Sequence, residues 1–136
     1  MKTVQVIKIG GNVINNPETL SKFLDDFALI NGPKILVHGR GRMPTTLSAT
    51  LGIPTKMVDG RRITDAETLK VVTMVYAGLI NKQIVAALQA RACNAMGFTG
   101  ADGNVIPAEK RPVKTIDYGF AGDIVQDKIN TTAIDV

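Results

Sequence analysis

The chain has 136 residues and a mass of 14.5 kDa, which suits one compact domain and is too short for two of ordinary size. Hydrophobic residues make up 45% of it and charged residues 21%, which argues against disorder. Aromatic residues make up only 4%, which argues against a stacking surface for single-stranded nucleic acid. The net charge of +4 suits an anionic ligand, but the lysines and arginines are too dispersed for a nucleic-acid or membrane patch.

The single cysteine and the apolar segments bear on where the protein works. Cys93 has no partner for a disulfide within the chain and fits a reducing compartment. Lys8 interrupts the apolar stretch at residues 4–9, so we expect no signal peptide, and no apolar run reaches the 18 residues of a membrane span. The sequence therefore predicts a cytoplasmic protein.

The first 38 residues predict a strand, a helix and a second strand. The segment at residues 4–9 is short and rich in β-branched residues, and it ends at Gly10 and Gly11. This pattern is typical of a buried strand followed by a tight turn. Asn16 and Pro17 predict the N-cap and first position of an amphipathic helix. Residues 34–38 predict the second strand. Such a βαβ unit has parallel strands and a right-handed crossover.

A long helix is predicted in the middle of the chain, after a short helix that ends at Gly52 and a short strand at residues 56–58. Thr64 and Glu67 form a capping box, and the helix reaches about Arg91, with Gly78 as a position for a kink. Additional apolar residues widen its stripe beyond one face, so the helix needs a second partner, either a larger core or another subunit. The stripe is assigned to Leu69, Val72, Tyr76, Leu79, Ile80, Ile84, Ala87 and Leu88, and the additional residues are Val71, Met74 and Val75.

The last third of the chain predicts mainly strands and turns. Residues 94–98 predict a third strand that ends in the turn-rich loop 97–103, and the apolar residues of 113–125, separated by glycines, predict short antiparallel strands. Residues 128–136 predict the start of a helix. The fold class is therefore α/β: a three-layer αβα sandwich with a mainly parallel open sheet, plus a β-hairpin region near the C-terminal end.

Two glycine-rich turns are candidates for binding an anion. Gly10 and Gly11 follow the first predicted strand, and residues 39–41 (Gly-Arg-Gly) follow the second, where open parallel sheets place their ligands. Missing side chains let backbone N–H groups approach phosphate or carboxylate oxygens, although glycines that only turn a strand into a helix would give the same pattern. Neither turn matches a P-loop or a complete Gly-x-Gly-x-x-Gly motif, since Pro44 stands where the third glycine of that motif would be.

Lys8 and Arg62 are the charged candidates. A lysine in an apolar strand is costly to bury without an anion, so Lys8 indicates phosphates at the first turn, unless it reaches solvent at a sheet edge. Arg61 and Arg62 precede a capped helix, where a guanidinium can bind a carboxylate with two hydrogen bonds, although solvated surface arginines are commoner. His38 lacks the neighbours of a nucleophilic site, and no His/Cys cluster suggests structural zinc.

Four segments, taken in order, resemble the amino acid kinase family. Residues 8–12 resemble its first strand and phosphate turn, and residues 37–41 its His-Gly-Gly-Gly loop. Residues 57–65 resemble the stretch that carries the substrate arginine, and residues 97–103 the loop that opens a later hairpin. The resemblance covers nearly the whole chain. It departs at Arg40, where the family has glycine, and in length, because related enzymes are considerably longer.

The resemblance implies phosphoryl transfer from ATP, bound with Mg²⁺, to the side-chain carboxylate of N-acetyl-L-glutamate in arginine biosynthesis. The chemistry agrees, because phosphoryl transfer needs positioning and charge neutralisation but no nucleophile from the protein. The implied roles are catalysis for Lys8, phosphate binding for Gly10, Gly11 and Gly39, and substrate binding for Arg40, Gly41 and Arg62, the last on the α-carboxylate.

The resemblance also implies that residues 1–136 are a single domain, the N-terminal acyl-amino-acid-binding and dimerisation lobe, without the C-terminal nucleotide lobe. We expect a chain that is inactive alone, forms a homodimer through the 64–91 helix, and binds neither nucleic acid nor membrane. Two alternatives stay open. One is a related kinase acting on N-succinyl-glutamate or on another carboxylate or carbamate, and the other is a non-catalytic anion-binding or dimerisation module.

Overall fold

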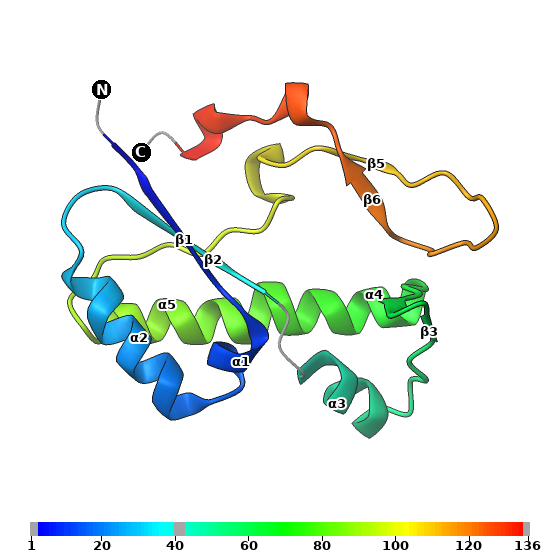
Figure 1. Cartoon of the computed structure of the whole chain (residues 1–136), viewed down its shortest axis with the longest axis horizontal. Coiled ribbons are helices and arrows are strands. Elements are labelled where there is room, and N and C mark those ends of the chain that lie inside the picture. Colours follow the sequence, from blue (N-terminus) through cyan, green and yellow to red (C-terminus); the bar gives the residue numbers. More distant parts are fainter. Residues whose placement is uncertain (1–2, 40–42, 135–136) are drawn as a thin grey trace.

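A computed structural model describes residues 3–39 and 43–134 of the chain (Figure 1). Strands β1 (Gln5–Ile9) and β2 (Lys34–His38) form a parallel pair, joined by the short helix α1 (Gly11–Ile14) and by α2 (Pro17–Leu29). The Asn16 side chain caps α2 by accepting a hydrogen bond from the Thr19 N–H at 3.0 Å. The predicted βαβ unit, with its cap and its proline, is therefore confirmed.

One continuous helix crosses the molecule beneath the strand pair, and it has three parts (Figure 1). They are α4 (Ala66–Thr73), the π-helical segment η1 (Met74–Ile80) and α5 (Asn81–Gln89). The predicted cap residue was wrong by one position, because the Asp65 carboxylate, not the Thr64 hydroxyl, accepts the Thr68 N–H at 2.8 Å. The backbone of Thr64 is instead hydrogen-bonded to Tyr118 and Phe120, which holds it outside the helix.

The π-helical segment changes which residues of this helix face the core. The buried apolar positions of this helix are four residues apart except between Val75 and Ile80, where the spacing is five. An i→i+5 turn in the hydrogen-bonding pattern accounts for that spacing. The predicted stripe was therefore partly wrong, since Leu79 is 43% exposed whereas Val71 is fully buried. Gly78 lies in η1, and the predicted kink takes the form of this π turn.

The same helix bears on the predicted absence of a membrane span. Residues Ala66–Gln89 form a 24-residue helix that contains an 18-residue window with a mean hydropathy of 1.5, so the helix is long and apolar enough to cross a membrane by length and composition alone. A core helix of a soluble protein passes this test as well. Its buried residues belong to the main hydrophobic core. That core consists of Ile9, Ile14, Leu24, Phe27, Val71, Val75, Ile80, Ile84 and Leu88.

Arg91 joins the end of this helix to α2. Its Nε donates to Asp25 Oδ1 at 2.7 Å, and one terminal nitrogen donates to the Ser21 hydroxyl at 2.7 Å. The other terminal nitrogen donates to the Ala87 carbonyl at 3.0 Å. The planar guanidinium therefore holds α2 and α5 together from one side chain that is 22% exposed.

The predicted third strand at residues 94–98 does not form among the residues that the structure describes. This segment is extended, but its carbonyl groups accept hydrogen bonds from side chains of α5 instead of a neighbouring strand. Lys82 Nζ donates to the Gly97 carbonyl at 3.1 Å, and Asn81 Nδ2 donates to the Phe98 carbonyl at 3.3 Å. Gln89 Nε2 also donates to the Ala95 carbonyl at 3.0 Å. The parallel sheet of the described residues therefore has two strands.

The remaining elements flank the long helix. Helix α3 (Met43–Thr50) contacts α4, and β3 (Met57–Val58) pairs antiparallel with β4 (Arg61–Arg62) across a tight turn. Strands β5 (Ala108–Lys110) and β6 (Gly122–Ile124) form an antiparallel hairpin, which Figure 1 shows above the start of α4. The predicted hairpin region is confirmed, but its strand positions were partly wrong, because β5 precedes residues 113–125 and most of that range forms the loop between the strands. The helix expected from residue 128 is replaced by two short 3-10 turns. These two turns are η3 (Gln126–Lys128) and η4 (Thr131–Ile134), and a further 3-10 turn, η2 (Asp102–Asn104), lies in the 97–103 loop region.

Candidate functional site

The two glycine turns lie side by side, as expected of parallel strands. Ile9 of β1 is in register with His38 of β2, and the Gly39 N–H donates to the Ile9 carbonyl at 3.3 Å. Gly10 is extended and caps α1, and a Cβ added to it would meet nothing within 4 Å. Packing within the chain therefore does not require glycine at position 10. The open space beside the turn leaves room for a ligand.

Lys8 lies on β1 two residues before Gly10. Its side chain is exposed, so the argument that a buried lysine must have an anionic partner does not apply to this structure. Alternation and register place it on one face of the strand pair with Val6, Ile35 and Val37, which are also exposed. The ammonium group is free to approach a phosphate held at the adjacent turn. Arg40 and Gly41, the other residues expected in this region, lie outside the described residues.

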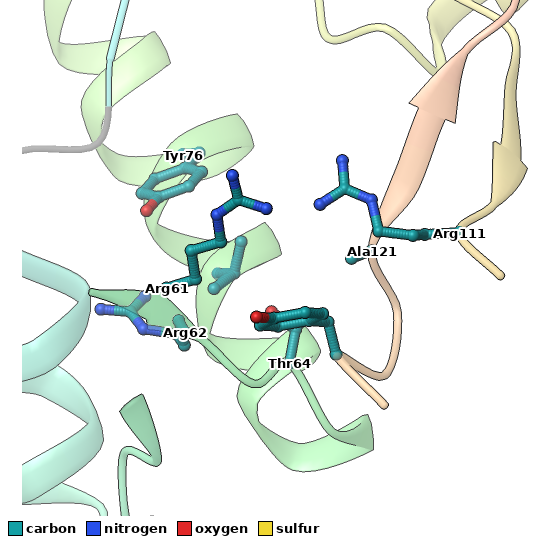
Figure 2. Close-up of a pocket in the computed structure, with 8 residues that line it drawn as sticks. Arg61, Arg62, Thr64, Tyr76, Arg111 and Ala121 are labelled. Carbon is teal, nitrogen blue, oxygen red and sulfur yellow. The ribbon is translucent and has the colours of Figure 1, made fainter. Parts of the chain in front are cut away.

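A second candidate site is a cavity of about 230 Å³ beside β4 and α4 (Figure 2). Strand β4, helix α4, segment η1 and the loop between β5 and β6 contribute to its walls. Among the described residues, the lining includes Arg62 but not Lys8 or the glycine turns. The lining residues are Arg61, Arg62, Thr64, Val72, Tyr76, Arg111, Tyr118 and Ala121.

A bridge between two distant segments assembles this cavity. The Thr64 N–H donates to the Tyr118 carbonyl at 3.0 Å, and the Phe120 N–H donates to the Thr64 carbonyl at 2.7 Å. Gly119, between them, has a φ of +71°, and a Cβ there would lie 2.2 Å from the Thr64 carbonyl oxygen. Glycine is therefore required at this position by both its conformation and the close approach of the two backbones.

The cavity has a positive electrostatic character. Three arginines line it, and none of its lining residues is acidic. Arg111 is fixed in place, because its Nε and a terminal nitrogen donate to Asp123 Oδ1 at 2.9 and 2.5 Å. These hydrogen bonds raise the pKa of Arg111 and hold the pKa of Asp123 below its usual value. The cavity can therefore bind a carboxylate or a phosphate by charge-assisted hydrogen bonds.

Sequence reasoning identified Arg62 in this cavity but missed Arg111, Tyr118 and Tyr76. Arg61 and Arg62 are neighbours in the sequence, whereas Arg111 is fifty positions away and reaches the cavity only through the bridge at Thr64. No local spacing connects these residues. The family resemblance at residues 57–65 was the signal that found Arg62.

The loop at residues 97–103 has a structural role in this chain. Asp102 accepts hydrogen bonds from the Thr99 N–H at 2.5 Å and from the Thr99 hydroxyl at 2.8 Å, and these bonds lower its pKa.

His38 is half-buried, and its Nδ1 lies 3.2 Å from the Gly39 carbonyl oxygen. Within the described ranges, no three His, Cys, Asp or Glu side chains form a group that could hold a metal ion.

Comparisons with known proteins place the chain in a family. The model of the amino acid kinase family matches residues 3–134. The chain is 60% identical to an acetylglutamate kinase of Bacteroides fragilis over 95% of its length, covering 49% of that protein. It is 65% identical to an acetylglutamate kinase of Bacteroides thetaiotaomicron over 88% of its length, covering 46% of that protein. The chain thus spans about half the length of these curated relatives.

A solved structure agrees with this assignment. The crystal structure of an N-acetylglutamate synthase from Neisseria gonorrhoeae, complexed with coenzyme A and N-acetyl-glutamate, matches 97% of the chain and 30% of that protein, with a TM-score of 0.71 and 25% identity. The predicted α/β fold class, with its parallel sheet and C-terminal hairpin, is the fold of this family.

Proposed function

Because the chain belongs to the amino acid kinase family, we propose that it is the N-terminal part of an acetylglutamate kinase. The reaction transfers the γ-phosphoryl group of ATP to the side-chain carboxylate of N-acetyl-L-glutamate, a step of arginine biosynthesis. A carboxylate oxygen forms a bond to the γ-phosphorus, the bond to the bridging oxygen breaks, and ADP leaves. The observation that carries this proposal is the high identity to acetylglutamate kinases over nearly the whole chain.

The arrangement at the strand ends supports the roles proposed for Lys8 and the glycines. Gly10 and Gly11 offer backbone N–H groups to the phosphates, and the open space beside Gly10 accommodates them. Gly39, whose own N–H donates to the Ile9 carbonyl, brings the second turn next to the first. Lys8 stabilises the negative charge that spreads over the transferring phosphoryl group. The substrate itself supplies the nucleophile, so this chain needs no catalytic Ser, Cys or His.

The acyl amino acid is held by different residues. Arg62 binds its α-carboxylate, and the positive character of the cavity beside Arg62 supports that role. Arg40 and Gly41 contact the acyl amino acid from the loop after β2.

We assign the nucleotide to a part of the protein beyond this chain. Residues 1–136 are then a single acyl-amino-acid-binding and dimerisation lobe, and a C-terminal lobe completes the ATP site. The described residues do not fit a magnesium site of their own, and the ion would bind through the phosphates of ATP, where it neutralises charge. No step on this chain depends on it. The proposed location is the cytoplasm.

A homodimer is the proposed assembly, formed through the long helix. Met74 and Leu79 lie on its outer side with exposures of 51% and 43%, although they are large apolar residues in the middle of the helix. Exposed apolar surface of this kind marks a contact with a partner, and a two-fold dimer is the commonest arrangement. A dimer contact over this surface would also remove exposed apolar side chains of this apolar helix from water.

A comparison of two protein lengths tests the proposed function. A version with the length of the curated relatives should consume ATP only when N-acetyl-L-glutamate is present and should form an acyl phosphate that hydroxylamine traps. The 136-residue chain should bind N-acetyl-L-glutamate in calorimetry without consuming ATP, because positioning the nucleotide is most of what such an enzyme contributes. Binding of neither ATP nor the acyl amino acid by the longer version would leave only a dimerisation module.

A further inference from the structure

The loop between α2 and β2 contains the one Asn-Gly pair in the sequence. Asn31 and Gly32 follow Ile30, the C-cap residue of α2, and both are exposed. Gly32 has a φ of +85°, and a Cβ added to it would meet nothing within 4 Å. The pair therefore combines a side-chain amide with a backbone nitrogen that no neighbouring atom shields.

The contacts of this loop leave both of these groups free. The Gln5 N–H donates to the Pro33 carbonyl at 3.0 Å, and Gln5 Nε2 donates to the Asn31 carbonyl at 3.4 Å. Across residues 3–39 and 43–134, neither the Asn31 side chain nor the Gly32 N–H has a hydrogen-bond partner. The loop is thus attached to β1 through two carbonyl groups, while the amide and the nitrogen that follows it are available for reaction.

Asn104 provides a comparison within the same chain. It is also exposed, but the N–H of the next residue, Val105, donates to the Asp102 carbonyl at 3.2 Å. The β-branched side chain of Val105 also crowds that nitrogen. The nitrogen after Asn104 is therefore occupied and hindered, whereas the one after Asn31 is neither.

We propose that Asn31 is a site of spontaneous deamidation, in which the Gly32 nitrogen closes a succinimide ring on the Asn31 side chain. The Gly32 nitrogen loses its proton and forms a bond to Cγ of Asn31. The bond between Cγ and Nδ2 breaks, and Nδ2 leaves as ammonia with that proton. Water then opens the ring at Cγ, which gives aspartate, or at the backbone carbonyl, which gives isoaspartate. The reaction needs no enzyme, and the inference is independent of the proposed function.

The conversion changes the loop in two ways. It places a carboxylate directly after the C-terminal end of α2, where the helix dipole disfavours a negative charge. Isoaspartate also routes the backbone through the side-chain carbon, which displaces the carbonyl that accepts from Gln5. Asn31 precedes β2, and the glycine turn at Gly39 follows it, so the length of β2, roughly 17 Å, separates the two. The modification should therefore lower the stability of the fold and leave the proposed phosphate-binding turns in place.

Peptide mapping by mass spectrometry tests the proposal on the 136-residue chain after incubation in a mildly alkaline buffer. The peptide with Asn31 should convert to separable aspartyl and isoaspartyl forms, and a protein isoaspartate methyltransferase should label the second form. Conversion at Asn31 should be at least about tenfold faster than at Asn104, where a hydrogen bond must first break. Equal rates at the two positions, or aspartate without isoaspartate, would overturn the proposal.

The same measurement in urea separates the effect of the folded loop from that of the sequence. Unfolding frees the nitrogen of Val105, so the rate at Asn104 should rise, while the rate at Asn31 should change little. Conversion of Asn31 in the unfolded chain alone would show that the folded loop protects it, and the proposal would fail.

Asn31→Gln and Asn104→Gln are matched variants for the effect on stability. Glutamine keeps the amide but closes a larger, less favourable ring. After the same incubation, the unfolding midpoint should fall in wild type and in Asn104→Gln and should stay at its initial value in Asn31→Gln. An equal fall in all three proteins would assign the loss of stability to another position and overturn the predicted effect of the conversion.

Discussion

Thr64 and Gly119 form a parallel bridge between the residue that precedes the long helix and the loop of the β5–β6 hairpin. Both the N–H and the carbonyl of Thr64 are used in it, by Tyr118 and Phe120. The bridge explains why the helix begins after Asp65 and not after Thr64. It also brings Arg111 to the cavity that β4 lines.

Gly119→Ala should destabilise the protein by breaking this bridge. A residue with a Cβ at a positive φ costs about 1–3 kcal/mol, and the Thr64 carbonyl oxygen leaves no room for the added carbon. Thermal unfolding should show a lower midpoint. Gly78→Ala is the control, because a Cβ there would meet nothing within 4 Å and alanine favours a helix. An unchanged midpoint for Gly119→Ala would contradict the required close approach.

Lys8→Ala should reduce turnover without affecting the fold. In a version of the protein with the length of its relatives, the turnover number should fall by about 10²–10³, the loss seen when one transition-state donor is removed. The Michaelis constant for N-acetyl-L-glutamate should change little. The exposed side chain at position 8 predicts an unchanged unfolding midpoint. A normal turnover number would refute the catalytic role.

Arg91→Lys should show how much of the α2–α5 contact depends on a forked side chain. Lysine cannot donate simultaneously to Asp25, Ser21 and the Ala87 carbonyl, so we expect a loss of about 1–2 kcal/mol in the free energy of unfolding. Urea titration measures this loss. Arg61→Lys, at an exposed arginine, should leave the titration unchanged. Equal stability of all three proteins would show that the contact contributes little.

The cap of α4 should make stability depend on pH. Hydrogen bonds from the backbone and side chain of Thr68 hold the pKa of Asp65 below its ordinary value of 3.8. A carboxyl whose pKa is lower in the folded state stabilises the fold above its unfolded pKa, and this contribution is lost as the pH falls through the folded pKa. The difference in unfolding midpoint between wild type and Asp65→Ala should therefore be constant from about pH 7 to 5 and shrink below about pH 4. A difference that stays the same down to about pH 2.5 would exclude the ionised cap.

Leu79→Lys should prevent self-association through the long helix. A charge in the middle of an apolar contact between two copies is costly to bury, so light scattering should change from twice the monomer mass to the monomer mass. Leu29→Lys is the control, since Leu29 is 78% exposed on α2 and lies outside this helix. A wild-type chain that stays monomeric at high concentration would contradict the dimer itself.

The sequence was sufficient where neighbouring residues determine the structure. Asn16 and Pro17 start α2 as predicted, because an N-cap depends on an N–H only two or three residues away. The closeness of Gly10 and Gly39 could also be predicted, since parallel strands end at the same edge of a sheet. These local rules are sufficient to locate the proposed phosphate-binding turns in the sequence.

The errors occurred where distant residues determine the structure. Thr64 and Asp65 are both good capping residues, and only the hydrogen bonds from the hairpin loop decide between them. Residues 94–98 have the composition of a strand, but side chains of α5 occupy their carbonyl groups. The same long-range contact, between Thr64 and the hairpin loop, brings Arg111 to the cavity, so the sequence alone could not place Arg111 there.

The π-helical segment sets the rotation of one half of the long helix relative to the other. Each residue of an α-helix turns the chain by about 100°, so if η1 became α-helical without losing a residue, α5 would rotate by about that angle relative to α4. Asn81 and Lys82 would then swing away from the carbonyl groups of Phe98 and Gly97. The α4 half, which lines the cavity, and the α5 half, which holds the 97–103 loop, thus keep their mutual orientation because the π turn accommodates one extra residue.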